Sequence, residues 1–243
     1  MRLAAAGISD CGNNRADNQD AFLVDAENRL FVVADGIGGH RGGAVAAKAT
    51  VTGLQLLLTK AQKPGTGRTM RGLQDIIRQL NASVYAEGTR SGALRGMGST
   101  LVCLLVGRRV AYVANMGDSR VYLLHHDRFT CLTKDHSLAA LLVREGEISA
   151  REAVSHPGRG HLTRYIGMEQ NVCPDICKVR LAVGDRFLLC SDGLWNVLPD
   201  KQMAKLLAED AQPDVLCANL IAAAKANGSQ DNITCVVVKG MHP

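Results

Sequence analysis

The sequence predicts a layered α+β domain, and three observations lead to this fold class. Apolar runs of strand length are separated by short polar breaks. Two pairs of segments have apolar residues at helical spacing, and a short loop joins the members of each pair. The expected order is strand, two helices, several strands, two helices, strand. This grouping fits separate layers of helices and antiparallel strands better than a repeating βαβ pattern.

The first expected elements are one strand and two helices. Residues 29–35 read RLFVVAD and run into a glycine turn, which is typical of a buried strand. Apolar residues at helical spacing predict a helix over residues 43–61, which ends before Pro64. A second helix over residues 70–88 is predicted by one apolar face, made of Leu73, Ile76, Ile77, Leu80 and Val84.

The middle of the chain predicts a meander of antiparallel hairpins. The expected strands cover residues 99–106, 109–115 and 120–125, with residues 129–132 as a candidate fourth. A short helix is expected over residues 137–146. Residues 151–163 are rich in Gly, His and Arg without clear periodicity, and they predict a loop.

The last part of the chain predicts a second group of strands and helices. Strands are expected at residues 179–181 and 186–190, and helices at residues 200–209 and 213–227. The sequence NITCVVVK at residues 232–239 predicts a closing strand.

Composition narrows the class of protein. A chain of 243 residues could form one large domain or two small ones, but it has no Pro/Ser-rich linker, charge block or solenoid repeat. We therefore expect a single domain over residues 1–243. The net charge of +5 is mild and mixed along the chain, and aromatic residues are scarce. This argues for an ordinary solvated surface and against a nucleic-acid partner.

The chain shows no segment that predicts export or membrane insertion. Its N-terminus lacks a convincing signal-peptide core, and no run approaches the roughly 18 apolar residues of a membrane span. Most of its eight cysteines lie inside apolar runs, where they are expected to be small buried side chains in a reducing compartment. Cys173 and Cys177 lack a matching second pair, so no zinc site is expected. We predict a cytoplasmic location and no membrane partner.

Four short acidic motifs carry the chemical signal. They read Asp35-Gly-Ile-Gly-Gly, Gly-Asp118-Ser-Arg, Ser-Asp192-Gly and Gln-Asp231-Asn. Three of these aspartates, at positions 35, 192 and 231, stand where an expected strand begins or ends. Each motif taken alone is compatible with an ordinary turn. Carboxylates gathered at the ends of strands in one sheet, without competing thiolates or imidazoles, would suit Mg²⁺ or Mn²⁺.

A basic residue near the N-terminus adds an anion-binding group. Arg15 stands five residues before Asp20, just ahead of the apolar run at residues 21–24. The planar guanidinium matches the oxygens of a phosphate group in a two-pronged contact. An exposed loop arginine without such a role is the alternative interpretation.

Eight motifs in order resemble those of a known family. They are Arg15-x-x-Asn-x-Asp20, Asp35-Gly-Ile-Gly-Gly-His40, Gly98-Ser-Thr100, Gly117-Asp118-Ser-Arg120, Lys-Asp135-His136-Ser137, Leu162-Thr-Arg164-x-Ile-Gly167, Ser191-Asp192-Gly193-Leu-Trp and Gln-Asp231-Asn232-Ile-Thr234. This series resembles the metal-dependent protein phosphatases, the type 2C serine/threonine phosphatases, and especially small bacterial members. The resemblance covers nearly the whole chain.

The resemblance implies a fold and a reaction. The family has an αββα sandwich, in which two central antiparallel sheets are flanked by antiparallel helix pairs. It uses two Mn²⁺ or Mg²⁺ ions, and water or hydroxide that bridges them attacks the phosphorus in line. No phosphoenzyme is implied, so neither a serine nor a cysteine is expected to be the nucleophile.

The resemblance also implies a role for each matching residue. Asp35 is expected to bridge both metals, and the Gly36 carbonyl to bind the first. Asp192 and Asp231 are expected to bind the second metal, and Asp118 joins Asp192 at a possible third. Arg15 is expected to hold the substrate phosphate. Asp20 is expected to orient water at the metals.

Several positions depart from the family pattern. Ile37 stands where many animal members have a histidine that is a candidate general acid, so the leaving group would take its proton from water or another residue. Gln19 replaces a common acidic residue, and Ala44 stands where bacterial relatives often have Glu. The histidines at positions 40, 136 and 161 are expected to be structural and not metal ligands.

Residues 135–167 correspond to the family's flap beside the active site. The segment carries Arg144, Glu145, Arg151, Arg159, His161 and Arg164. One hypothesis is that its basic groups recognise a phosphoprotein substrate, and the alternative is a solvated loop without a specific role.

Three functions are compatible with this sequence. The leading prediction is a monomeric phosphoserine/phosphothreonine phosphatase that acts on phosphorylated proteins and opposes a cytoplasmic Ser/Thr kinase. A non-catalytic phosphoprotein-binding regulator on the same fold is the alternative from another class, although the expected metal ligands are all present. A third possibility narrows the substrate to a protein of a partner-switching pathway.

Overall fold

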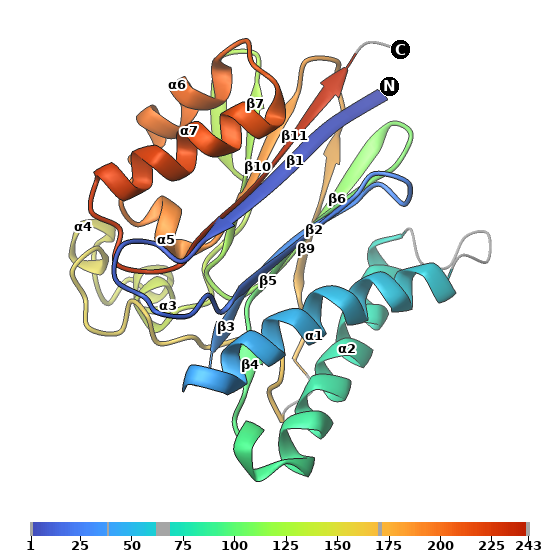
Figure 1. The fold of residues 1–243 in the computed structure, drawn as a ribbon, viewed down its shortest axis with the longest axis vertical. Coiled ribbons are helices and arrows are strands. Elements are labelled where there is room, and N and C mark those ends of the chain that lie inside the picture. The colour runs from blue at the N-terminus through green and yellow to red at the C-terminus, as the bar shows by residue number, and fades with distance from the viewer. Residues whose placement is uncertain (1, 38, 62–68, 170–171, 242–243) are drawn as a thin grey trace.

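Two antiparallel sheets pack face to face between two layers of helices (Figure 1). The computed structural model describes residues 2–37, 39–61, 69–169 and 172–241. Within these ranges, no helix is long and apolar enough to cross a membrane. The α+β class and the αββα arrangement expected from the sequence are confirmed.

The first sheet contains both ends of the described chain. Its strands, in spatial order, are β1 (Arg2–Asp10), β11 (Ile233–Met241), β10 (Arg186–Cys190), β7 (Arg120–His125) and β8 (Arg128–Cys131). Helices α6 (Asp200–Ala208) and α7 (Pro213–Ala226) cover its outer face (Figure 1). The predicted strands at residues 120–125, 129–132, 186–190 and 232–239 and both predicted helices are therefore present.

The second sheet contains the strand that ends in Asp35-Gly36-Ile37. Its order is β2 (Asp20–Asp25), β3 (Leu30–Ile37), β5 (Leu101–Val106), β6 (Val110–Met116) and β9 (Asp175–Arg180), and β4 (Gly98–Ser99) pairs with the end of β3. Helices α1 (Gly39–Lys60) and α2 (Met70–Arg90) cover its outer face, and a 3₁₀ turn, η1 (Gly92–Leu94), follows them.

Strand β3 is buried on both faces, which explains why its sequence is apolar without alternation. Leu30, Val32 and Ala34 face the α1/α2 layer, whereas Phe31 and Val33 join the core between the sheets. Successive side chains of a strand point to opposite faces, so a strand buried on both sides reads as a continuous apolar run. The same alternation places Asp35 on the face of Phe31 and Val33, at the end of the space between the sheets.

The sequence analysis did not predict the two strands nearest the N-terminus. Strand β1 reads RLAAAGISD, and its alanines and glycine have low strand propensity. It forms because all nine residues pair with the strongly apolar β11. Strand β2 contains the apolar run at residues 21–24, which by itself was too short to predict a strand.

Two later predictions need correction, and one short helix was not predicted. The strand expected at residues 179–181 is β9, which begins at Asp175 and ends at Arg180. It was misplaced because Lys178 and Arg180 are exposed on this edge strand and hide the apolar pattern. Within the expected loop, helix α4 (Ala150–Ala153) begins with a capping box between Ser149 and Glu152. Helix α5 (Asp192–Trp195) was also not expected.

A buried amide joins helix α2 to the loop that follows residue 166. The Asn81 side chain is 4% exposed, and its Oδ1 accepts hydrogen bonds from the Gly167 amide at 2.8 Å and the Met168 amide at 3.1 Å. Its Nδ2 donates to the Met168 carbonyl at 2.9 Å. On the other side of the loop, the backbones of Ser99 and Ile166 exchange hydrogen bonds of 2.9 and 2.8 Å.

Replacing Asn81 tests this connection. Asn81→Leu is expected to lower the free energy of unfolding by about 2–4 kcal/mol, because buried backbone groups lose their partners. Urea denaturation measures the change. Ser83→Ala, on the exposed face of the same helix, is the control and should change stability by less than about 0.5 kcal/mol. Equal stability of both variants would contradict the assignment.

Candidate metal and phosphate site

Six of the seven predicted site residues line one cleft at the end of the sandwich. The cleft has a volume of about 780 Å³. It is lined by Arg15, Gln19, Asp35, Gly36, Ile37, Thr100, Asp118, Gly160, His161, Leu162, Tyr165, Asp192 and Asp231. These residues come from both sheets and from the segment at residues 135–167, so the cleft exists only in the folded chain.

Asp20, the seventh predicted residue, lies behind the cleft. The register of β2 and β3 pairs Asp20 with Asp35. Ser191, which directly precedes Asp192, donates a hydrogen bond of 2.8 Å to Asp20 Oδ2. The pairing of two strands thus brings Asp20 next to Asp35, and the end of β10 brings Asp192 to the same place from the opposite sheet.

Two polar side chains that had no predicted role hold the aspartates in position. Thr100 Oγ1 accepts a hydrogen bond of 2.8 Å from the Asp35 amide, and it contacts Ser119 Oγ at 2.7 Å. Asn232 Oδ1 accepts from the Gln19 amide at 2.8 Å. Both residues belong to motifs that the sequence analysis recognised. Their role became clear only from their hydrogen-bond partners in the structure.

Glycine is required at position 36 by close backbone packing. A Cβ atom there would lie 2.2 Å from the Gly43 carbonyl oxygen and 2.6 Å from the Gln19 carbonyl oxygen. Such distances are too short for any side chain. Helix α1 and the loop before β2 therefore approach the end of β3 directly, and they fix the backbone beside Asp35.

The cleft concentrates negative charge in a place of low solvation. Burial is the main cause that raises the pKa of Asp35 well above its ordinary value, and the nearby Asp20 and Asp192 raise it further. Burial, followed by the charge of Asp192, raises the pKa of Asp118 to about 8. Burial also raises the pKa of Asp20 and of Asp192 to about 6.

Two carboxylate oxygens have no hydrogen-bond partner in the described part of the chain. They are Asp20 Oδ1 and Asp192 Oδ1, and both are buried. Buried anionic oxygens that repel one another and lack donors are costly, and a bound divalent cation would remove both costs. The donor set consists of oxygen atoms, which is the chemistry that Mg²⁺ and Mn²⁺ prefer. The residues present therefore fit such ions.

The carboxylates do not form a closed metal cage by themselves. Among the described side chains, no three His, Cys, Asp or Glu residues are arranged to enclose an ion. Asp231 Oδ2 instead pairs with Arg15 Nη2 at 2.8 Å, and Asp192 Oδ2 accepts from Asn196 Nδ2 at 3.0 Å. An ion at Asp231 would have to replace the Arg15 contact, and water would complete its coordination.

Trp195 links a residue of the cleft to two arginine side chains. Its Nε1 donates a hydrogen bond of 3.0 Å to the Asp118 carbonyl. The Arg120 guanidinium stacks 3.4 Å from the centre of the indole ring and forms a two-pronged ion pair with Asp135. Arg159 approaches the ring at 5.4 Å and donates to Asn196, which in turn contacts Asp192. Sequence analysis assigned no function to Trp195.

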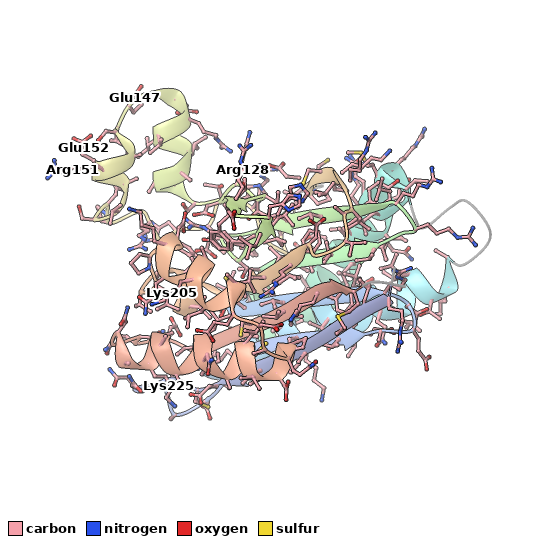
Figure 2. The ribbon with its side chains drawn as sticks, turned by 90° about the horizontal axis from the view of Figure 1, so that it is seen from above. Arg128, Glu147, Arg151, Glu152, Lys205 and Lys225 are labelled. Carbon is pink, nitrogen blue, oxygen red and sulfur yellow. The ribbon has the colours of Figure 1, made fainter. Side chains whose placement is uncertain are left out.

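The basic residues of the segment at residues 135–167 differ in position. His161 lines the cleft, and Arg164 pairs with Asp175 at 2.7 Å. Helices α3 (Leu138–Glu145) and α4 stand out from the sandwich, with Arg151 on their outer side (Figure 2). Only part of this segment therefore faces the cleft.

His136 makes structural contacts, and Ile37 brings no ionisable group to the cleft. His136 is buried, its Nδ1 accepts from the Gly117 amide at 3.2 Å, and its Nε2 lies 3.2 Å from Asp175 Oδ2. The His40 side chain lies outside the described part of the structure. Ile37 lines the cleft and provides no acid at that position.

Comparison with known proteins identifies the class. Residues 10–213 match the family model for protein phosphatase 2C. The chain is 36% identical over 232 residues to the serine/threonine phosphatase stp of Listeria innocua, covering 93% of this chain and 90% of the relative. It is 32% identical to the protein phosphatase PhpP of Streptococcus pneumoniae, covering 95% of each chain.

Solved structures agree with the sequence comparison. The serine/threonine phosphatase PstP/Ppp of Mycobacterium tuberculosis superposes with a TM-score of 0.90 at 34% identity over the full length of both chains. A structure of the PstP catalytic domain in complex with two manganese ions gives a TM-score of 0.87 at 33% identity, with 99% of each chain covered. The chain belongs to the protein phosphatase 2C family and is a serine/threonine phosphatase.

Replacing Asp192 tests the metal fit without measuring activity. Saturating Mn²⁺ is expected to raise the melting temperature of the unmodified chain by about 5–10 °C, because an ion that binds only the folded state stabilises it. Asp192→Asn should reduce this rise to less than about half. Asp127→Asn, in the exposed turn between β7 and β8, is the control and should keep the full rise. An undiminished rise in Asp192→Asn would contradict the site.

Proposed function

We propose that this phosphatase hydrolyses phosphoserine and phosphothreonine in proteins with two divalent ions, Mn²⁺ or Mg²⁺, and water as the nucleophile. One observation carries the proposal: poorly solvated, mutually repelling aspartates and an arginine line the same cleft. The cluster supplies ligands for cations, and the arginine supplies a group for phosphate.

Each predicted site residue receives a role in this proposal. Asp35 and the Gly36 carbonyl would hold the first ion, and Asp35, Asp192 and Asp231 the second. Asp118 and Asp192 would hold a third ion where one binds. When bound, the ions lower the pKa of water and neutralise the phosphoryl oxygens.

Asp20 would orient the attacking water from behind these ligands. Its Oδ2 is held by the Ser191 hydroxyl at 2.8 Å, whereas its Oδ1 remains without a hydrogen-bond donor among the described groups. A carboxylate held at one oxygen and open at the other is suited to accept a hydrogen bond from water.

Arg15 would exchange one anionic partner for another during the reaction. Without substrate it pairs with Asp231, and its side chain is 55% exposed at the mouth of the cleft. A guanidinium on an exposed loop can turn to the oxygens of an incoming phosphate group and position it in line with the nucleophile. We assign the proton of the leaving group to solvent water, since position 37 carries an isoleucine.

The proposal also covers the domain organisation of the enzyme, its substrates and its location. We infer that residues 1–243 form a single phosphatase domain, with residues 135–167 as its flap. The substrates would be phosphorylated proteins, among them a Ser/Thr kinase and its targets, and the enzyme would act as a cytoplasmic monomer. The position of His161 in the lining of the cleft supports a role for this flap residue in substrate contact.

Hydrolysis with and without metal tests the proposal directly. The chain is expected to hydrolyse an aryl phosphate and phosphothreonine peptides in Mn²⁺, and chelator should abolish both activities. Asp192→Asn should lower kcat/KM by about 100-fold or more, while Asp127→Asn leaves it unchanged. Full activity in chelator would exclude the metal mechanism. Tight phosphopeptide binding in Mn²⁺ without turnover would favour the regulator instead.

Arg15→Ala is expected to separate phosphate binding from metal binding. The variant should lower kcat/KM by about 10- to 100-fold, with Arg15→Lys in between. Its half-saturating Mn²⁺ concentration should not rise, because Asp231 loses a competing partner. Steady-state kinetics across a Mn²⁺ titration measure both values.

The exposed Arg128 on β8 provides the matched control for that experiment (Figure 2). Arg128→Ala removes the same charge far along the sheet from the carboxylate cluster and should leave both values unchanged. Loss of Mn²⁺ affinity in Arg15→Ala would show that Arg15 supports the metal ligands and not the phosphate.

A further inference from the structure

A second cavity shares one wall with the catalytic cleft. It has a volume of about 310 Å³ and lies between helix α2, the turn after η1 and the loop at residues 165–169. Its lining consists of Tyr85, Gly88, Thr89, Gly96, Met97, Tyr165, Gly167, Met168 and Glu169. Tyr165 also lines the catalytic cleft, so the two spaces adjoin at this ring.

The shared wall is held firmly in place. The Tyr165 ring packs directly on Gly98, where a Cβ atom would lie 2.6 Å from two ring carbons. The next residue, Ile166, is bonded to Ser99 through two backbone hydrogen bonds. The hydrogen bonds of Asn81 then fix Gly167 and Met168 against helix α2. The cavity is therefore formed before any ligand arrives, which lowers the entropic cost of binding.

The lining favours a positively charged guest. Tyr85 and Tyr165 supply aromatic rings, and Met97 and Met168 supply polarisable side chains. Among the described residues of the lining, Glu169 is the one carboxylic acid, and none is a lysine or an arginine. Aromatic faces and a carboxylate together attract an ammonium or guanidinium group. Arg90 and Arg95 are exposed neighbours in sequence, but they do not line the cavity.

The geometry points to a subsite that accepts a lysine or arginine side chain near the phosphorylated residue of the substrate. This inference rests on the proposed function, because the phosphate must occupy the catalytic cleft. The occupant is the substrate's own chain, because Tyr165 borders both the catalytic cleft and this cavity. Selectivity for a basic neighbour would then arise from Tyr85 and Glu169, which lie outside the catalytic cleft.

A peptide series tests this subsite. Phosphothreonine peptides carry one arginine, leucine or glutamate at each position in turn on both sides of the phosphorylated residue. At one or two positions, arginine should raise kcat/KM about fivefold or more over leucine, and glutamate should lower it. Hydrolysis of an aryl phosphate, which cannot reach the cavity, is measured in parallel.

Two variants identify the groups responsible. Glu169→Gln and Tyr85→Leu should each reduce the arginine preference to about twofold or less, with unchanged hydrolysis of the aryl phosphate. Glu87→Gln is the matched control, because Glu87 is exposed on the same helix and is not part of the lining. It removes the same charge and should keep the full preference.

The outcomes separate this inference from the proposed function. Turnover of all peptides without an arginine preference, or a preference for glutamate, would overturn the subsite and leave the phosphatase assignment intact. A preference that Glu87→Gln removes equally would reduce it to a general charge effect and also overturn it. If no substrate is turned over, the proposed function fails, and binding of the same labelled peptides by fluorescence anisotropy then decides whether the arginine preference exists.

Discussion

The structure depends on one electrostatic constraint: aspartates that repel one another are held together at the end of the sandwich. Asp35 lies at the end of a strand whose preceding residues are buried on both faces. Asp20 is paired with it in register, and Asp192 comes from the opposite sheet. The apolar core between the sheets supplies the stabilisation that keeps these strands in contact despite the repulsion. Because this concentrated negative charge lacks sufficient hydrogen-bond donors, the site favours the binding of cations.

The polar contacts around the aspartates offset only part of this repulsion. Thr100 binds the Asp35 amide, Ser191 binds one oxygen of Asp20, and Asn232 binds the amide of the neighbouring Gln19. Asp20 Oδ1 and Asp192 Oδ1 are left without donors among the described groups. Arg15 neutralises Asp231 from the exposed side of the cleft. Because the supporting residues are already bonded to the scaffold, the proposed binding of ions and phosphate would require little rearrangement beyond release of Arg15 from Asp231.

The flap and the second cavity are attached to the same framework. Trp195 bonds to the backbone of Asp118 and lies between two arginines, one of which belongs to residues 135–167. At the opposite side of the cleft, Asn81 and Ser99 hold the loop that contains Tyr165. The segments proposed to contact substrate are thus joined to the end of the sandwich that holds the aspartates through a few buried or stacked side chains.

The sequence by itself determined the fold class, the order of most helices and strands, and the identity of the acidic residues, because apolar periodicity and short motifs are local signals. It did not reveal β1, whose alanine-rich residues form a strand only against β11. Nor did it show that Asp231 pairs with Arg15, that Trp195 supports Asp118, or that Tyr165 separates two cavities. Those features join residues that are far apart in the chain, and only the packing of the two sheets and their helices decides which of them meet.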